Sequence, residues 1–107
     1  MTTFDKREEA FEKKFAIDEE LKFKAGARRN RLLGLWVAEK LGKTGTDVDS
    51  YAKEVVVAEF EGAGDASVVR KVMSDLTAKG IAVGEQEVRA RMDELMAQAI
   101  AQVKAGT

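Results

Sequence analysis

The chain has 107 residues, with 18 Lys and Arg against 19 Asp and Glu, so its formal net charge is −1. It contains no Cys and no His. The missing Cys excludes a disulfide framework, a thiol nucleophile and a zinc site built on thiolates, and the missing His removes the commonest general base and metal ligand. No apolar run is long enough to span a membrane, and the N-terminus has no apolar signal stretch. We expect one soluble, cytoplasmic domain.

The composition and the glycine positions predict an all-α fold. The chain has no Pro and few aromatic residues, and the pattern lacks the regular alternation of a β-sandwich. Six of the nine glycines stand in three clusters, and Gly commonly ends a helix. The clusters divide the chain into four helical pieces and are Gly42/Gly45, Gly62/Gly64 and Gly80/Gly84. Four helices joined by short turns predict a small, mostly antiparallel four-helix bundle.

The first piece, residues 4–41, would make a helix of roughly 55 Å, which is long for a domain of this size. Its apolar stripe changes face near Ile17–Asp18. We therefore predict an N-terminal arm over residues 1–17, helix-prone but mobile and partly disordered when free, and a bundle over residues 18–107. The first core helix would then begin near Asp18.

The other helix ends carry recognisable signals. Thr46 and Asp65 are suitable N-cap residues, and Gly80 suits the position just after a helix C-terminus. The β-branched run Val55–Val57 permits a strand, but no partner strand is evident elsewhere, so we predict a helix there.

Two short motifs invite a functional interpretation. Gly42-Lys43-Thr44 resembles the end of a phosphate-binding loop, but Val37 stands where the motif needs its first Gly. We predict an ordinary helix C-terminus there and leave weak nucleotide binding open. Arg28–Arg31 is a basic run whose residues point about 100° apart on a helix and lack interleaved aromatic residues. We interpret it as a solvated helix face.

Several remaining features are structural. Asp18–Glu20 clusters carboxylates with no His or Cys beside them, so we predict no catalytic residue, no metal site, no cofactor and no enzyme activity. Gly34 is predicted to admit a neighbouring helix closely, and Trp36 to lie in the core. Residues 26–43 carry five basic and one acidic side chain, and residues 44–64 carry one basic and five acidic, which predicts intramolecular pairing between them.

The N-terminal arm is the unusual segment. Thirteen of the residues from 2 to 25 are charged, yet Phe4, Phe11 and Phe15 share one helix face. Either the three rings pack on the bundle, or the arm orders when its Phe face enters a groove of a partner.

The sequence resembles a known family over nearly its whole length. The resemblance is carried by FDKRE at 4–8, FEKKFA at 11–16, DEEL at 18–21, FKA at 23–25, ARRNRLLGLW at 27–36, YAKEVV at 51–56 and residues 65–72. In order and spacing these are similar to the zeta subunit of the alphaproteobacterial F-type ATP synthase, the ATPase inhibitor subunit zeta. The first fifty or so residues carry the most specific part of the resemblance.

This resemblance implies an inhibitor that prevents wasteful ATP hydrolysis. The arm would insert at a catalytic α/β interface of the synthase head, beside the γ subunit of the rotor, and block rotation in the hydrolysis direction. The implied partners are the α, β and γ subunits, with the protein monomeric when free, peripheral to the inner membrane and not inserted into it. The expected protein-binding residues are Phe4, Lys6, Arg7, Phe11, Lys13, Lys14, Phe15 and Glu19.

One position departs from the family pattern. Ile17 stands where we expect His in many relatives, so we predict no imidazole switch of inhibition between pH 6 and 8.

Two other classes of function stay open at this point. A helical adaptor or antitoxin-like protein could use the same arm on another enzyme, and pull-down partners would separate the two. A nucleic-acid binder acting through Arg28–Arg31 is disfavoured by the net charge of −1.

Overall fold

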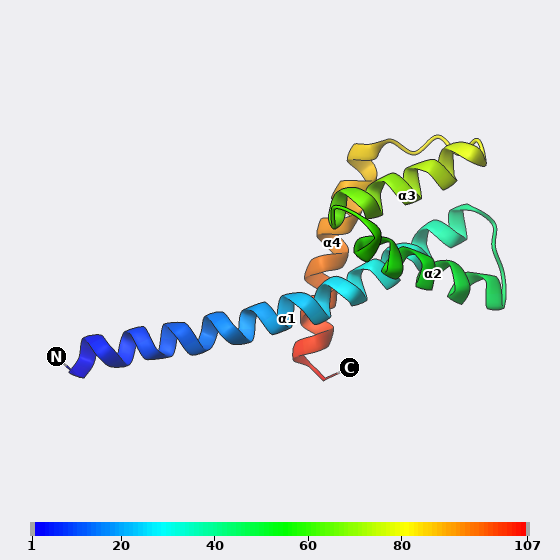
Figure 1. Ribbon diagram of the computed structural model, residues 1–107. Coiled ribbons are helices and arrows are strands. Elements are labelled where there is room, and N and C mark those ends of the chain that lie inside the picture. The colour runs from blue at the N-terminus through cyan, green and yellow to red at the C-terminus, as the bar shows by residue number, and fades with distance from the viewer. Residues whose placement is uncertain (1, 107) are drawn as a thin grey trace.

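The computed structural model describes the backbone of residues 2–106 and the side chains of residues 19–106. In this part of the chain it contains four α-helices and no strand: α1 (Thr2–Lys40), α2 (Thr46–Ala58), α3 (Asp65–Ala78) and α4 (Glu85–Lys104) (Figure 1). A short 3₁₀ turn, η1 (Glu59–Glu61), continues α2. The predicted all-α class and the helix at Val55–Val57 are confirmed.

The backbone of α1 is one helix from Thr2 to Lys40, where the sequence predicted an arm and a separate core helix. The continuity has a simple local reason. No Gly or Pro occurs before Gly26, and the intervening Glu, Lys and Ala residues favour a helix. The side chains of residues 1–18 lie outside the described part. The mobility of the arm and the division of the chain at residue 17 stay predictions.

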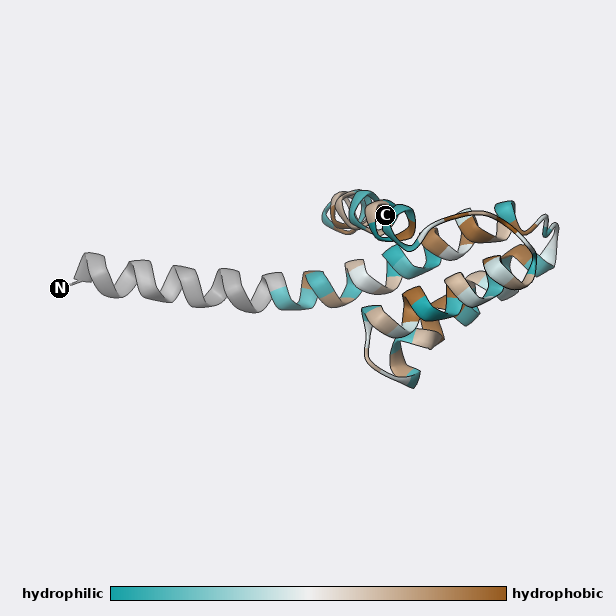
Figure 2. Ribbon diagram, turned by 90° about the horizontal axis from the view of Figure 1, so that it is seen from above, coloured by the Kyte–Doolittle hydropathy of each residue, from teal (hydrophilic) through white to brown (hydrophobic). Residues whose placement is uncertain are grey.

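Two helices pack directly on α1. α2 returns beside it in the antiparallel sense, as predicted, whereas α4 crosses it steeply (Figure 1). Figure 2 views the same crossing from above, with α4 seen nearly end-on and α1 lying in the plane. Gly34 explains the closeness of α1 and α2, because a Cβ built there would stand 2.6 Å from Ala52 Cα. The predicted close approach at Gly34 is confirmed.

The core consists of aliphatic side chains drawn from all four helices. Tyr51 is its one buried aromatic among the described residues, and Trp36 is only partly buried at the edge of the cluster, so the prediction of a core Trp holds in part. The aliphatic members that are fully shielded from solvent include Leu33, Val37, Val55, Val68, Val72, Leu76 and Val88.

The predicted N-caps are wrong. Thr46 and Asp65 are the first residues of α2 and α3; Gly45 and Gly64 occupy the cap positions, and no side chain caps either helix. Both glycines have positive φ, 59° and 61°, which favours Gly because it has no Cβ.

The predicted stop at Gly80 is confirmed. The Gly80 N–H donates to Thr77 O at 2.9 Å, and the Ile81 N–H donates to Leu76 O at 2.9 Å. These two bonds form a Schellman motif, with Gly80 at a φ of 75°.

Candidate functional site

Most of the predicted binding residues lie outside the described side chains. Seven of the eight lie in residues 1–18, whose side chains are not described: Phe4, Lys6, Arg7, Phe11, Lys13, Lys14 and Phe15. Glu19 is described and is exposed on α1. Two turns further along, Ala25 is the first described residue that is buried against the bundle.

The phosphate-loop-like triplet Gly42-Lys43-Thr44 is a helix C-terminus. The Gly42 N–H donates to Glu39 O at 3.1 Å and the Lys43 N–H donates to Ala38 O at 3.0 Å, which is again a Schellman motif. The backbone amides of Gly42 and Lys43 are therefore used within the turn. The predicted structural interpretation of the triplet is confirmed.

The basic run on α1 contains a buried polar network that sequence reasoning missed. Arg29 is 5% exposed and Asn30 is fully buried. The Arg29 guanidinium donates to both carboxylate oxygens of Asp65, at 2.7 and 3.3 Å, and to Asn30 Oδ1 at 2.9 and 3.1 Å. Asn30 Nδ2 donates to Glu59 Oε2 at 3.1 Å. The prediction of a solvated face is wrong at these two positions.

The network joins three elements, because Arg29 and Asn30 belong to α1, Glu59 to η1 and Asp65 to α3. A buried guanidinium is costly unless it is paired and hydrogen-bonded, and here one carboxylate and one amide satisfy it. Removing one partner would leave a buried charge, so the network fixes how α1 lies against the α2–α3 connection. The exposed pair Arg31–Asp49, at 3.7 Å, joins residues 26–43 to residues 44–64 and bears out the predicted intramolecular charge pairing, whereas Asp65 lies just beyond the predicted acidic segment.

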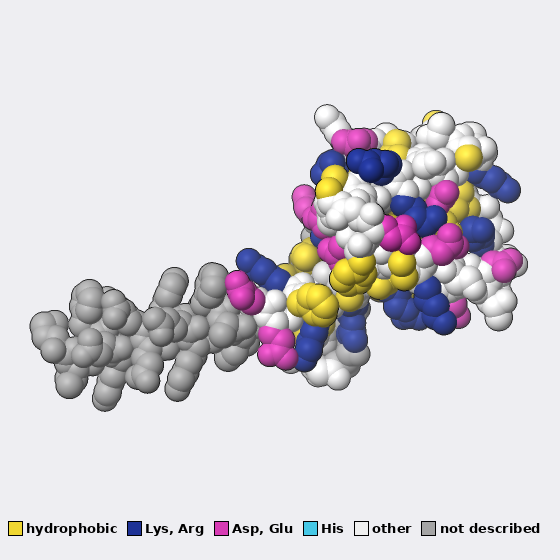
Figure 3. All heavy atoms as spheres, in the orientation of Figure 1, with side chains coloured by type: hydrophobic (Ala, Val, Ile, Leu, Met, Phe, Trp, Pro, Cys, Tyr) yellow, Lys and Arg dark blue, Asp and Glu magenta, His cyan; other side chains and the backbone are white. Residues whose placement is uncertain are grey.

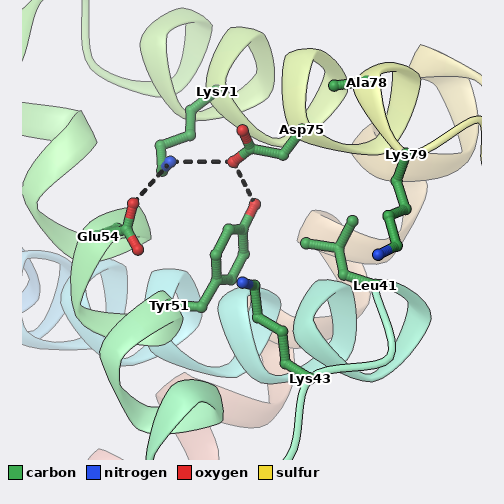
Figure 4. Close-up of a pocket in the computed structure, with 8 residues that line it drawn as sticks. All are labelled: Leu41, Lys43, Tyr51, Glu54, Lys71, Asp75, Ala78 and Lys79. Carbon is green, nitrogen blue, oxygen red and sulfur yellow. Dashed lines mark hydrogen bonds and ion pairs between the residues drawn. The ribbon is translucent and has the colours of Figure 1, made fainter.

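A second polar cluster lines an open cleft of about 300 Å³ between α2 and α3 (Figure 4). The Tyr51 hydroxyl donates to Asp75 Oδ2 at 2.8 Å. Lys71 Nζ donates to the same oxygen at 2.9 Å and to Glu54 Oε1 at 3.2 Å. Lys43 Nζ lies over the Tyr51 ring, 5.5 Å from its centroid.

Tyr51 and Lys71 do not change protonation state near neutral pH. Burial, the hydrogen bond to Asp75 and the charge of Glu54 all raise the pKa of Tyr51 above its ordinary value. Burial lowers the pKa of Lys71, but its hydrogen bonds to Asp75 and Glu54 outweigh burial and raise the pKa. Tyr51 therefore stays neutral and Lys71 stays charged. In addition, no group of three or more His, Cys, Asp or Glu among the described residues could hold a metal ion.

Comparison with known families is decisive for this chain. The family model for ATPase inhibitor subunit zeta matches residues 1–102. The chain belongs to this family. A structure determined by solution NMR is 53% identical in sequence and has a TM-score of 0.70; the match covers 81% of this chain and 99% of that one. No curated protein matches the chain significantly.

Membership of the zeta family settles the class of function. A zeta subunit is a regulatory, non-catalytic protein that inhibits an ATPase, which confirms the predicted inhibitor role and the prediction that the chain is not an enzyme. Its partner is accordingly the ATP synthase. None of the described helices is long and apolar enough to cross a membrane.

Proposed function

We propose that this zeta-family inhibitor stops ATP hydrolysis sterically, through the N-terminal part of α1. Residues 2–17, running into Glu19, insert at a catalytic α/β interface of the synthase head beside the γ subunit and block rotation in the hydrolysis direction. The bundle stays outside the interface. No chemistry by the inhibitor is needed, and neither a cofactor nor a metal takes part.

The observation that carries the proposal is the continuity of α1, which runs from Thr2 to Lys40 without a break. The same helix enters the buried network at Arg29 and Asn30. A blocking helix must resist the force of a turning rotor, and a helix fixed by buried contacts at one end transmits such a force to the whole bundle.

The energetics favour a segment that is already helix-prone before it binds. Ordering a free segment costs about 1–2 kcal/mol per residue in backbone entropy. Residues 2–17 are rich in helix-favouring Glu, Lys and Ala and lack Gly and Pro, which lowers that cost. Phe4, Phe11 and Phe15 would then supply apolar contacts in pockets, and Lys6, Arg7, Lys13 and Lys14 would pair with acids at the rim and set orientation and on-rate.

The test is ATP hydrolysis by the purified cognate synthase head, measured with the full chain and with a chain lacking residues 1–19. The described core begins at Ala25, so this deletion leaves it intact. A triple variant with Phe4, Phe11 and Phe15 changed to Ala removes the Phe side chains but keeps the full length of the arm. Its matched control changes Glu8, Glu9 and Glu12 to Ala.

We expect the full chain and the Glu control to inhibit the head. The deletion and the Phe variant are expected to lose roughly a hundredfold or more in inhibitory potency, because buried aromatic side chains dominate interfaces. Equal inhibition by the full and shortened chains would place the activity in the bundle and refute the proposal. If no form inhibits the head, pull-down partners would decide whether the arm acts on another enzyme.

A further inference from the structure

The two phenylalanines whose side chains are described are both exposed. Phe23 on α1 is 68% exposed and Phe60 in η1 is 66% exposed, so neither described Phe belongs to the core. Val57 at the end of α2, 49% exposed, is the third large exposed apolar side chain among the described residues. Large aromatic side chains bury well, so two left in water point to a surface that another molecule covers.

These residues lie at one place on the molecule. The bond between Asn30 and Glu59 sets the register of α1 against the end of α2. Phe60 is adjacent to Glu59, and Phe23 is seven residues before Asn30, or about 10 Å along the helix axis. Figure 3 shows hydrophobic side chains gathered on this face, where the described start of α1 passes the end of α2. We refer to Phe23, Val57 and Phe60 as the Phe patch.

The rim of the Phe patch carries charges of both signs. Glu61 follows Phe60 and is exposed, and Glu19 is exposed one helical turn before Phe23. Lys22 beside Phe23 and Lys53 one helical turn before Val57 are exposed as well, and Lys24 pairs with Glu20 at 3.1 Å. A complementary partner surface is apolar at its centre and polar at its edge.

We propose that the Phe patch is a second docking surface for the ATP synthase head. It packs on an apolar surface beside the mouth of the groove that takes the N-terminal segment. This inference rests on the function proposed above, and its physical reason is distance. Phe23 follows Ile17 by six residues of one continuous helix, about 9 Å. A partner that encloses the helix up to residue 17 therefore has its own surface against the next two turns.

The second contact would act mainly on dissociation. Two surfaces of one chain that bind the same partner together each hold the other at high local concentration. Losing the Phe patch leaves the N-terminal contact in place but lets the complex come apart faster.

The experiment measures inhibition and binding kinetics on the purified synthase head, with the full-length chain carrying Phe23→Ala and Phe60→Ala together. Gln98→Ala, at an exposed position on α4 outside the Phe patch, is the matched control. Because both Phe side chains are about two-thirds exposed, the double variant is expected to keep the wild-type melting temperature. The double variant is expected to need at least about tenfold more protein for the same inhibition, and the loss is expected to appear as faster dissociation.

Three results would overturn the inference in distinguishable ways. If the wild-type chain does not inhibit the head, the proposed function fails and the inference fails with it. If the wild type inhibits and the double Phe variant matches it within twofold, only the Phe patch is refuted. If sedimentation shows wild-type dimers at assay concentration that the double variant dissolves without losing potency, the Phe patch is a contact between two copies of this chain.

Discussion

Alanine substitutions at Gly34 and Gly26 test the packing of α1 on α2 with a matched pair. Both glycines lie in α1 and both are buried. A Cβ at Gly26 would meet nothing within 4 Å, whereas a Cβ at Gly34 would stand 2.6 Å from Ala52 Cα and 3.2 Å from Ala52 Cβ. The clash at Gly34 is with backbone, so a side-chain rotation cannot relieve it and α2 must move away.

The magnitude follows from two opposing terms. Ala in place of Gly inside a helix stabilises by about 0.8–1 kcal/mol, and this gain is common to both variants. Overpacking a close contact costs about 1–3 kcal/mol, and only Gly34→Ala incurs it. We therefore expect Gly26→Ala to raise the free energy of unfolding by about 1 kcal/mol and Gly34→Ala to leave it unchanged or lower it by up to about 2 kcal/mol.

Thermal unfolding followed by circular dichroism measures the difference. For a domain of about 100 residues, 1 kcal/mol corresponds to roughly 4–8 °C, so Gly26→Ala is expected to melt at least about 4 °C above Gly34→Ala. If Gly34→Ala melts as high as Gly26→Ala, the close approach of the two helices is not a constraint on the fold.

Three further predictions follow from the polar networks and the composition. Asp65→Asn, which removes the charge facing the buried Arg29, is expected to cost about 1–3 kcal/mol in urea unfolding, while Asp49→Asn, from an exposed pair, costs under about 1 kcal/mol; equal losses would contradict the buried pairing. Tyr51 is the only Tyr in the chain, so tyrosinate absorbance reports it alone. Because its pKa is raised, the Tyr51 hydroxyl of the folded protein should not ionise near pH 10. The stability that this group contributes is full below that pH and falls as the pH rises above it. Ionisation of Tyr51 near pH 10 without unfolding would be the contrary result. Because the chain has no His, its inhibition is expected to show no imidazole transition between pH 6 and 8, whereas Ile17→His introduces one; identical pH profiles for the two chains would assign any transition to the synthase.

Local features were predictable from the sequence because they depend on neighbours along the chain. The glycine clusters gave the number of helices, and the Schellman turn at Gly80 needs only a residue that tolerates positive φ. The close contact at Gly34 was also predictable, since a Gly inside an apolar helical stripe costs stability unless something packs there. The resemblance carried by residues 4–36 identified the family before any geometry was considered.

The pairing of polar residues far apart in the chain was decided only by the tertiary structure. Arg29 and Asn30 look like part of a solvated basic run, and nothing local says that Asp65 lies opposite them, 36 residues away from Arg29. The same contact explains the wrong cap, because the Asp65 carboxylate bonds the guanidinium instead of the first turn of α3. Helix stops such as Gly80 and apolar helix faces are set by residues within a few positions, whereas a buried ion pair depends on how whole helices cross, and that information exists only once the chain has folded.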